Sequence, residues 1–205
     1  MSEDWVVSPL SELCEVFTDG DWVESKDQSP QGIRLVQTGN IGEGIFKNRP
    51  EKARYISSAT FDRLRCTEII QGDCLVSRLP DPVGRACLLP ATGERMITSV
   101  DCTIIRFKQK MLIPQFFVYY SQSPNYLRAV ASECTGTTRS RISRKNLGLI
   151  PIPVPPLSEQ QRIVALLDEA LDLEVKRLAE IYERKLACLE ELRKSFLQQA
   201  FSEPL

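Results

Sequence analysis

A basic, hydroxyl-rich segment near residue 140 carries the residue types that hold phosphate groups. Arginine and lysine supply positive charge, while threonine hydroxyls and a glycine backbone supply hydrogen-bond donors. The phosphate-binding candidates are Gly136, Thr137, Thr138, Arg139, Arg141, Arg144 and Lys145. Contacts of this kind bind a nucleic-acid backbone whatever its base sequence, so the segment predicts a surface that binds a polyanion.

A second group of residues has side chains suited to contact base edges or to wedge beside them. They lie at expected strand ends, in glycine-flanked loops or in a long polar loop. The members are Trp22, Lys26, Gln37, Asn40, Arg78 and Arg85. Each has an alternative role that involves no DNA. Asn40 can instead hold a turn, and Trp22 can instead cap the core. For Arg85 the alternative is an ion pair with Asp81 or Asp101.

The sequence argues against catalysis by this chain. It contains no histidine for general base chemistry near neutral pH. The Asn/Asp-Pro-Pro-aromatic tetrad of amino-methyltransferases is missing, because Pro155 and Pro156 are flanked by valine and leucine. A PD…(D/E)xK nuclease pattern fails after Pro80-Asp81, because no lysine stands two residues beyond Glu94. We expect no catalytic residue and no cofactor in this chain.

Cysteine use and hydropathy define the compartment that we expect. The seven cysteines form no CxxC pair, and without histidine they do not suggest zinc, so we expect reduced thiols and no structural metal. No apolar run approaches the roughly 18 residues of a membrane span. The first residues are acidic and lack a signal-peptide core. These features predict a cytoplasmic location.

Charge is distributed unevenly along the chain. The formal net charge is −1, yet residues 31–157 hold eighteen basic against nine acidic side chains, and thirteen of the eighteen are arginine. Arginine presents a planar fork that suits phosphate and the guanine edge. The basic middle therefore favours nucleic acid as the partner.

Residues 1–157 are expected to form an α+β domain in which strands dominate. Short β-type runs are separated by glycine and proline, which is typical of a barrel-like or strongly bent sheet. The expected strands cover 33–38, 41–46, 74–79, 84–89, 96–107 and 147–154, with a strand or helical turn at 10–17. Helices are expected at 58–64 and at 114–134, the second broken near residue 123.

Residues 158–205 are expected to form one long helix. Ser158 and Gln161 have the spacing of a capping box, and no glycine or proline follows until Pro204. A helix of about 44 residues would be about 65 Å long. Its apolar residues recur every eleven positions, a period that implies a nearly straight helix. The stripe consists of Val164, Leu167, Leu171, Val175, Leu178, Tyr182, Leu186 and Leu189.

Such a stripe needs a partner helix along its length, because packing supplies most helix stability. We expect a second copy of the chain or another protein to provide it. A helix folded back on itself would need a turn near its centre, and residues 180–185 offer none.

Several motifs resemble the DNA specificity subunits of type I restriction-modification systems. The join IPIPVPPLSEQQRIVALLD resembles the boundary at which a target-recognition domain continues into a spacer helix. LSELCEVFTDGDWVESKDQSPQGIRLVQTGNI resembles the opening of such a domain, and GDCLVSRLPDPVGRACLL its central strand pair. The resemblance implies a target-recognition domain over 1–157 and a spacer helix over 158–205.

Members of that family commonly carry two recognition domains and two helices, whereas this chain resembles one of each. The resemblance implies a homodimer that reads an interrupted palindrome in double-stranded DNA, with the helices setting the spacing. It also implies a methyltransferase subunit using S-adenosylmethionine and a restriction subunit using ATP, both on separate chains. The alternatives are a stand-alone DNA-binding regulator and a helical adapter.

Overall fold

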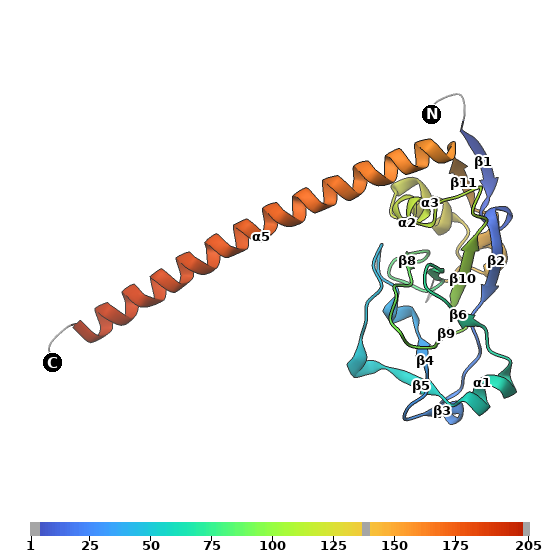
Figure 1. The fold of residues 1–205 in the computed structure, drawn as a ribbon, viewed down its shortest axis with the longest axis horizontal. Coiled ribbons are helices and arrows are strands. Elements are labelled where there is room, and N and C mark those ends of the chain that lie inside the picture. The colour runs from blue at the N-terminus through green and yellow to red at the C-terminus, as the bar shows by residue number, and fades with distance from the viewer. Residues whose placement is uncertain (1–4, 137–139, 203–205) are drawn as a thin grey trace. The chain divides into compact units, whose positions relative to one another are not determined.

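The computed structural model describes residues 5–136 and 140–202. The chain divides into two compact units, Met1–Gln161 and Arg162–Leu205. The first unit is rich in strands, and the second is the continuation of the long helix α5 (Leu157–Ser202) (Figure 1). The predicted fold class, a mostly β domain of α+β type followed by a long helix, is confirmed.

The strands of the described residues form three sheets. One has the antiparallel order β2-β10-β7-β8, formed by β2 (Cys14–Asp19), β10 (Cys102–Phe107), β7 (Cys74–Ser77) and β8 (Ala86–Leu88). A second has the order β3-β5-β4-β9-β6, formed by β3 (Gln28–Ser29), β5 (Arg54–Ile56), β4 (Ile33–Val36), β9 (Met96–Thr98) and β6 (Glu68–Ile69). Only β4 and β9 pair in parallel in that sheet. The third joins β1 (Val6–Pro9) to β11 (Pro151–Val154).

Short helices begin where serine and proline dictate. They are α1 (Ser58–Leu64), α2 (Pro114–Tyr120), α3 (Pro124–Ser132) and α4 (Arg144–Leu149). The hydroxyl groups of Ser57, Ser123 and Ser143 each accept a hydrogen bond from a backbone N–H in the first turn that follows. Proline at the first position of α2 and α3 fits there because that N–H has no helical partner. Single-turn 3-10 helices occur at η1 (Leu10–Leu13), η2 (Ser25–Asp27), η3 (Thr38–Asn40) and η4 (Pro50–Lys52).

The core lies around β10 and β7. One cluster includes Leu75, Met96 and Ile104, all fully buried. Aromatic rings form a second contact group, in which Phe117 lies 5.1 Å from Phe107 and 5.8 Å from Tyr126, measured between ring centroids. Each ring pair adds about 0.5–1.5 kcal/mol beyond its buried area.

Most of the cysteines behave as small apolar residues of the interior. All seven are free thiols, and five of them are buried. Burial raises the pKa of Cys14, Cys87 and Cys102 to about 12, so these thiols stay protonated near neutral pH. No group of histidine, cysteine and acidic residues that could hold a metal ion occurs in the described part of the chain. Within the same residues, no helix is long and apolar enough to cross a membrane.

Several expected boundaries were wrong. Residues 41–46 form a loop closed by one bridge between Ile41 and Phe46, because Gly44, with a φ of +78°, allows the chain to reverse. The expected strand at 96–107 is split into β9 and β10 by a turn. The first residues of the expected strand at 147–154 belong to α4, which the cap at Ser143 starts. The long helix already includes Leu157, so Ser158 lies inside its first turn and is not its cap.

Candidate nucleic-acid interface

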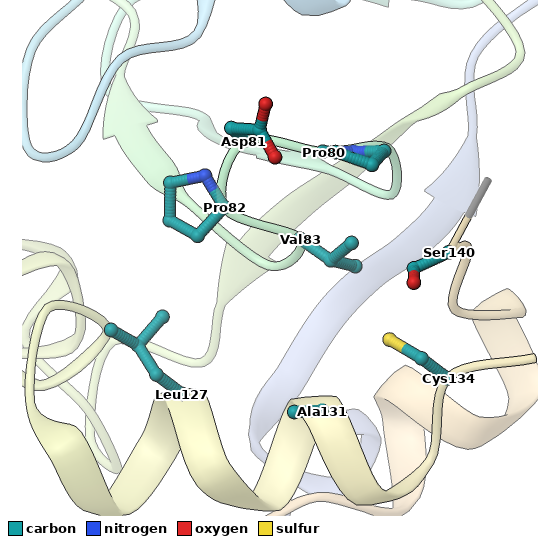
Figure 2. A pocket seen from close by; sticks show the side chains of 8 residues that line it. All are labelled: Pro80, Asp81, Pro82, Val83, Leu127, Ala131, Cys134 and Ser140. Atoms are coloured by element: carbon teal, nitrogen blue, oxygen red, sulfur yellow. The ribbon is translucent and has the colours of Figure 1, made fainter. Parts of the chain in front are cut away.

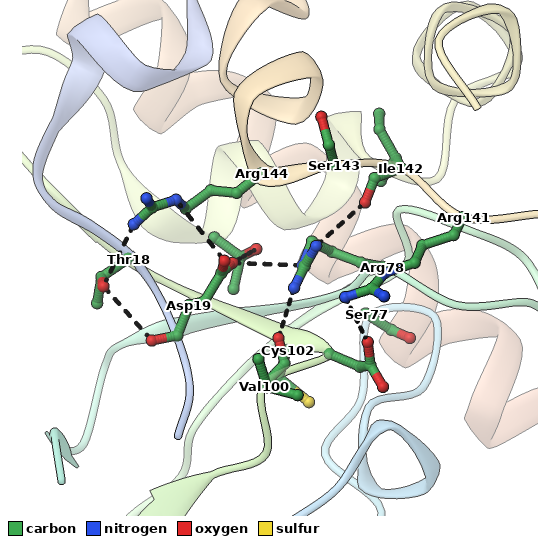
Figure 3. A network of polar contacts seen from close by, with 12 residues as sticks. Thr18, Asp19, Ser77, Arg78, Val100, Cys102, Arg141, Ile142, Ser143 and Arg144 are labelled. Atoms are coloured by element: carbon green, nitrogen blue, oxygen red, sulfur yellow. Dashed lines mark hydrogen bonds and ion pairs between the residues drawn. The ribbon is translucent and has the colours of Figure 1, made fainter. Parts of the chain in front are cut away.

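The predicted phosphate-binding segment contacts the ends of two strands. Asp19, the last residue of β2, lies 3.3 Å from Nε of Arg78 and 3.7 Å from Nε of Arg144 (Figure 3). Nη2 of Arg141 lies 2.9 Å from a carboxylate oxygen of Asp101. The structure therefore brings Arg78, Arg141 and Arg144 together, as Figure 3 shows, although acidic residues lie beside all three.

Arg78 is an interior residue. Its side chain is 5% exposed, and its guanidinium donates to the carbonyl oxygens of Val100 and Ile142 at 2.5 and 3.4 Å. Burial lowers the pKa of Arg78, and the nearby carboxylate of Asp19 opposes that effect. These contacts join the end of β7 to the segment before α4. They favour a positioning role for Arg78 over the predicted contact with a base.

Arg85 has the same character. Its guanidinium donates to four main-chain carbonyl groups at 2.7–3.0 Å, and burial lowers its pKa. The acceptors are Thr38, Ile41, Leu79 and Pro82. The alternative of an ion pair with Asp81 or Asp101 is thus replaced by backbone contacts. Arg85 joins the loop after β4 to the turn after β7.

Asn40 holds a turn, which is the alternative given above to a contact with a base. Its Oδ1 accepts from the backbone N–H of Gln37 at 2.9 Å, and its Nδ2 donates to the carbonyl of Lys47 at 2.9 Å. Asn40 is buried, whereas Gln37 is half-buried. Of this pair, Gln37 retains an accessible side chain for the predicted base contact.

Trp22 and Lys26 lie on the surface. Trp22 is 68% exposed, so it does not cap the core, and its ring N–H donates to Glu24 at 3.4 Å. The Lys26 ammonium forms an ion pair with the same carboxylate at 2.7 Å. Glu24 therefore offsets the charge of Lys26, while the Trp22 ring remains available to a partner.

The remaining predicted phosphate ligands are exposed or lie outside the described residues. Lys145, in α4, is exposed. Thr137, Thr138 and Arg139 are not among the described residues. Gly136 has a φ of +102°, a value that favours glycine because it lacks a Cβ atom.

A hollow of about 250 Å³ lies near this segment, between the turn at 80–83 and α3 (Figure 2). Val83, Leu127 and Ala131 give it an apolar lining, and Cys134 and Ser140 lie at the end nearest α4. Among the described residues that line the hollow, Asp81 carries the one acidic side chain.

Sequence reasoning missed a group of cations in the loop before β5 and at the first residue of that strand. Lys47, Lys52 and Arg54 are exposed, and Arg49 is half-buried. The signal was present, because four bases stand within eight residues against one acid, Glu51.

The predicted apolar stripe is exposed along the helical unit. From Leu167 to Leu189 the exposed fraction of its side chains ranges from 38% to 64%. The helix also carries the pairs Glu174–Arg177 and Glu180–Arg184. Pairs at this spacing add only about 0.3–0.5 kcal/mol each, so they do not replace packing of the stripe.

Residues 2–183 match the family model described as type I restriction modification DNA specificity domain. The chain belongs to this family. The match includes the β-rich unit and more than half of α5, so the specificity domain continues into the helix as far as residue 183.

Relatives of this specificity domain are longer proteins. This chain is 23% identical over 173 residues to a Methanocaldococcus jannaschii protein provisionally named the specificity subunit of type I restriction enzyme MjaX. The aligned region covers 82% of this chain and 39% of that protein. This chain matches the crystal structure of an HsdS subunit from Thermoanaerobacter tengcongensis with a TM-score of 0.65 and 23% identity, covering 100% of this chain and 46% of that one.

A second solved structure is matched over the same share of its own chain, 46%. A chain from a structural study of complex assembly and conformational transition in the type I R-M system superposes with a TM-score of 0.70 and 24% identity, covering 98% and 46% of the two chains. At these identities the solved structures show a shared fold. This specificity domain spans less than half of the length of the relatives it matches.

Proposed function

We propose that this chain recognises a specific sequence in double-stranded DNA as the specificity component of a type I restriction-modification system. The observation that carries the proposal is the family match over residues 2–183, which includes the β-rich unit and more than half of the helix. The excess of basic residues in 31–157 supports a polyanionic partner. Catalysis is assigned to partner subunits, a methyltransferase that binds S-adenosylmethionine and a restriction subunit that uses ATP.

We further propose that two copies pair through the stripe on α5. A helix that exposes leucine, valine and tyrosine side chains along most of its length is stabilised by burying them against another helix. A second copy would supply a second recognition domain. A symmetric pair implies a target made of two half-sites in inverted orientation, separated by a fixed number of base pairs.

Selection of bound duplexes from a random pool tests the proposal. We expect enrichment of a bipartite motif with constant spacing, because each copy reads one half-site. Enrichment of a single undivided site would contradict pairing. Absence of enrichment would contradict sequence recognition and leave the helical adapter.

The partner subunits are tested by co-expression. A methyltransferase subunit that co-purifies with the chain and methylates adenine within the selected motif supports the restriction-modification role. DNA recognition without any associated methyltransferase would support the stand-alone regulator.

A further inference from the structure

Charge compensation divides the basic residues of the β-rich unit into two classes. Many lie against a carboxylate, including Arg34 with Glu94 and Arg106 with Asp73. Among the described basic residues of 31–157, those without an ion pair or a side-chain hydrogen bond are Lys47, Arg49, Lys52, Arg54, Arg65, Lys110 and Lys145. Four of these lie between Lys47 and Arg54.

We propose that Lys47, Arg49, Lys52 and Arg54, here named the basic strip, form the main contact with the phosphate backbone of duplex DNA. This inference rests on the proposed function and assigns its phosphate-binding surface. A cation already paired with a carboxylate must lose that partner to bind phosphate, whereas an uncompensated cation releases only its hydration and gains a charge-assisted contact.

The main chain of the basic strip is held in place. The carbonyl of Lys47 accepts from Nδ2 of Asn40 at 2.9 Å, and its N–H donates to the carbonyl of Asn40 at 2.7 Å. At the other end, Arg54 opens β5 and pairs with Leu35 of β4. Fixed anchors lower the entropy lost when the cations bind, so the basic strip is pre-organised for a rigid partner.

Arg49 connects the basic strip to the turn beside Gln37. A Cβ atom at Gly39 would lie 3.1 Å from Nη1 of Arg49, so the guanidinium lies next to that turn. Gln37 immediately precedes η3 and is half-buried. A phosphate contact at Arg49 therefore lies close to a side chain that can read a base edge.

The length of the basic strip suits several phosphates. Eight residues span at most about 26 Å when fully extended. Phosphates of one strand follow one another at about 3.4 Å along the duplex axis. Even with the helical turn η4 inside it, the basic strip is long enough to meet more than one of them.

The test compares two double variants of the full chain that each remove one lysine and one arginine. Lys52→Gln/Arg54→Gln changes the basic strip, and Arg65→Gln/Lys110→Gln removes equal charge elsewhere. Binding to a labelled 30-base-pair duplex of random sequence is measured by fluorescence anisotropy over a range of salt concentrations. Urea unfolding confirms that both variants are folded.

We expect the slope of log K against log salt to be shallower by about 2 units for Lys52→Gln/Arg54→Gln, because each lost phosphate contact removes about 0.9. The control pair should leave the slope unchanged. Equal changes in both variants would show a net-charge effect and overturn the basic strip. No change in either would also overturn it while leaving DNA binding in place.

Two further outcomes identify failures of other kinds. If the unaltered chain binds neither the random duplex nor any selected one, the proposed function itself fails, and the inference fails with it. If polyglutamate displaces the duplex at equal charge concentration, the surface fits an acidic protein and the assignment to duplex DNA is overturned.

Discussion

Arg85 organises the β-rich unit from a buried position, because one guanidinium donates to four carbonyl groups on two loops. We expect Arg85→Met, which keeps volume but removes the donors, to lower the free energy of unfolding by about 3 kcal/mol or more, since buried acceptors would lose their partners. Urea unfolding followed by circular dichroism measures this. Arg65→Met, at an exposed site, should change stability by no more than about 0.5 kcal/mol. Equal effects would refute the bridging role.

Asp27 links stability to pH. A hydrogen bond from Arg63 at 2.6 Å, the largest cause, lowers the pKa of Asp27 below its ordinary value. The unfolded chain therefore binds the proton first on acidification, so the contribution is complete above about pH 5 and is lost as pH falls through the folded pKa. We expect Asp27→Asn to make the fall in unfolding free energy between about pH 4 and pH 2 shallower.

Urea midpoints at a series of pH values measure that change. Asp172→Asn, at an exposed aspartate on α5, is the control for the removal of one carboxylate outside this ion pair. A slope unaltered by Asp27→Asn would mean that the ion pair with Arg63 does not contribute.

Arg141 and Arg144 remain predicted phosphate ligands, and each is about half exposed beside an acid. We expect Arg141→Ala/Arg144→Ala to weaken binding to all duplexes and to flatten the salt dependence by up to about one unit per lost contact. The carboxylates already offset part of their charge, so the loss should be smaller than for the basic strip. An unchanged salt slope would remove this segment from the interface.

The division between structural and free arginines could not be predicted from the sequence. Counting charges located the basic middle, but every arginine contributed equally to that count. The carboxylates that pair with the structural arginines lie far from them in the sequence. Asp19, for example, pairs with Arg78 and Arg144. The run from Lys47 to Arg54 was visible, yet its significance depends on the fact that none of its four cations forms an ion pair within the described residues.

At the scale of elements, the sequence predicted what local rules determine. Serine and proline located α1 and the pair α2 and α3, and the uninterrupted periodic pattern located α5. Short apolar runs were less informative, because their length fits a strand or a helix equally well. The run at 147–154 shows this, since α4 continues into it before β11 begins.

The exposed stripe on α5 gives a prediction about assembly. We expect Leu178→Lys to disrupt helix pairing, because a charge in the middle of the stripe would lose its hydration in the dimer. Sedimentation should then show a monomer. Glu169→Lys changes charge on the opposite face and should leave the dimer intact. A dimer that survives Leu178→Lys would show that pairing uses another surface.

At the scale of the whole molecule, pairing and DNA recognition should be coupled. A dimer with two recognition domains gains affinity when both half-sites are present, because the second contact is intramolecular. We expect the unaltered chain to prefer a duplex with two selected half-sites over a duplex with one by at least about tenfold. The Leu178→Lys monomer should show little preference, which titration of both duplexes measures. A preference retained by the monomer would contradict the coupling.

The hydrogen bonds of Arg85 constrain the backbone of two loops and not the identity of the side chains at the accepting residues. All four acceptors are carbonyl groups, which every amino acid carries. The half-buried side chain of Thr38 can therefore be exchanged without removing the bond that shapes its loop, whereas Ile41 and Leu79 are also held by burial. A loop whose backbone is held by such hydrogen bonds tolerates changes of its accessible side chains. New side-chain contacts can therefore evolve on these loops while their backbone paths stay the same.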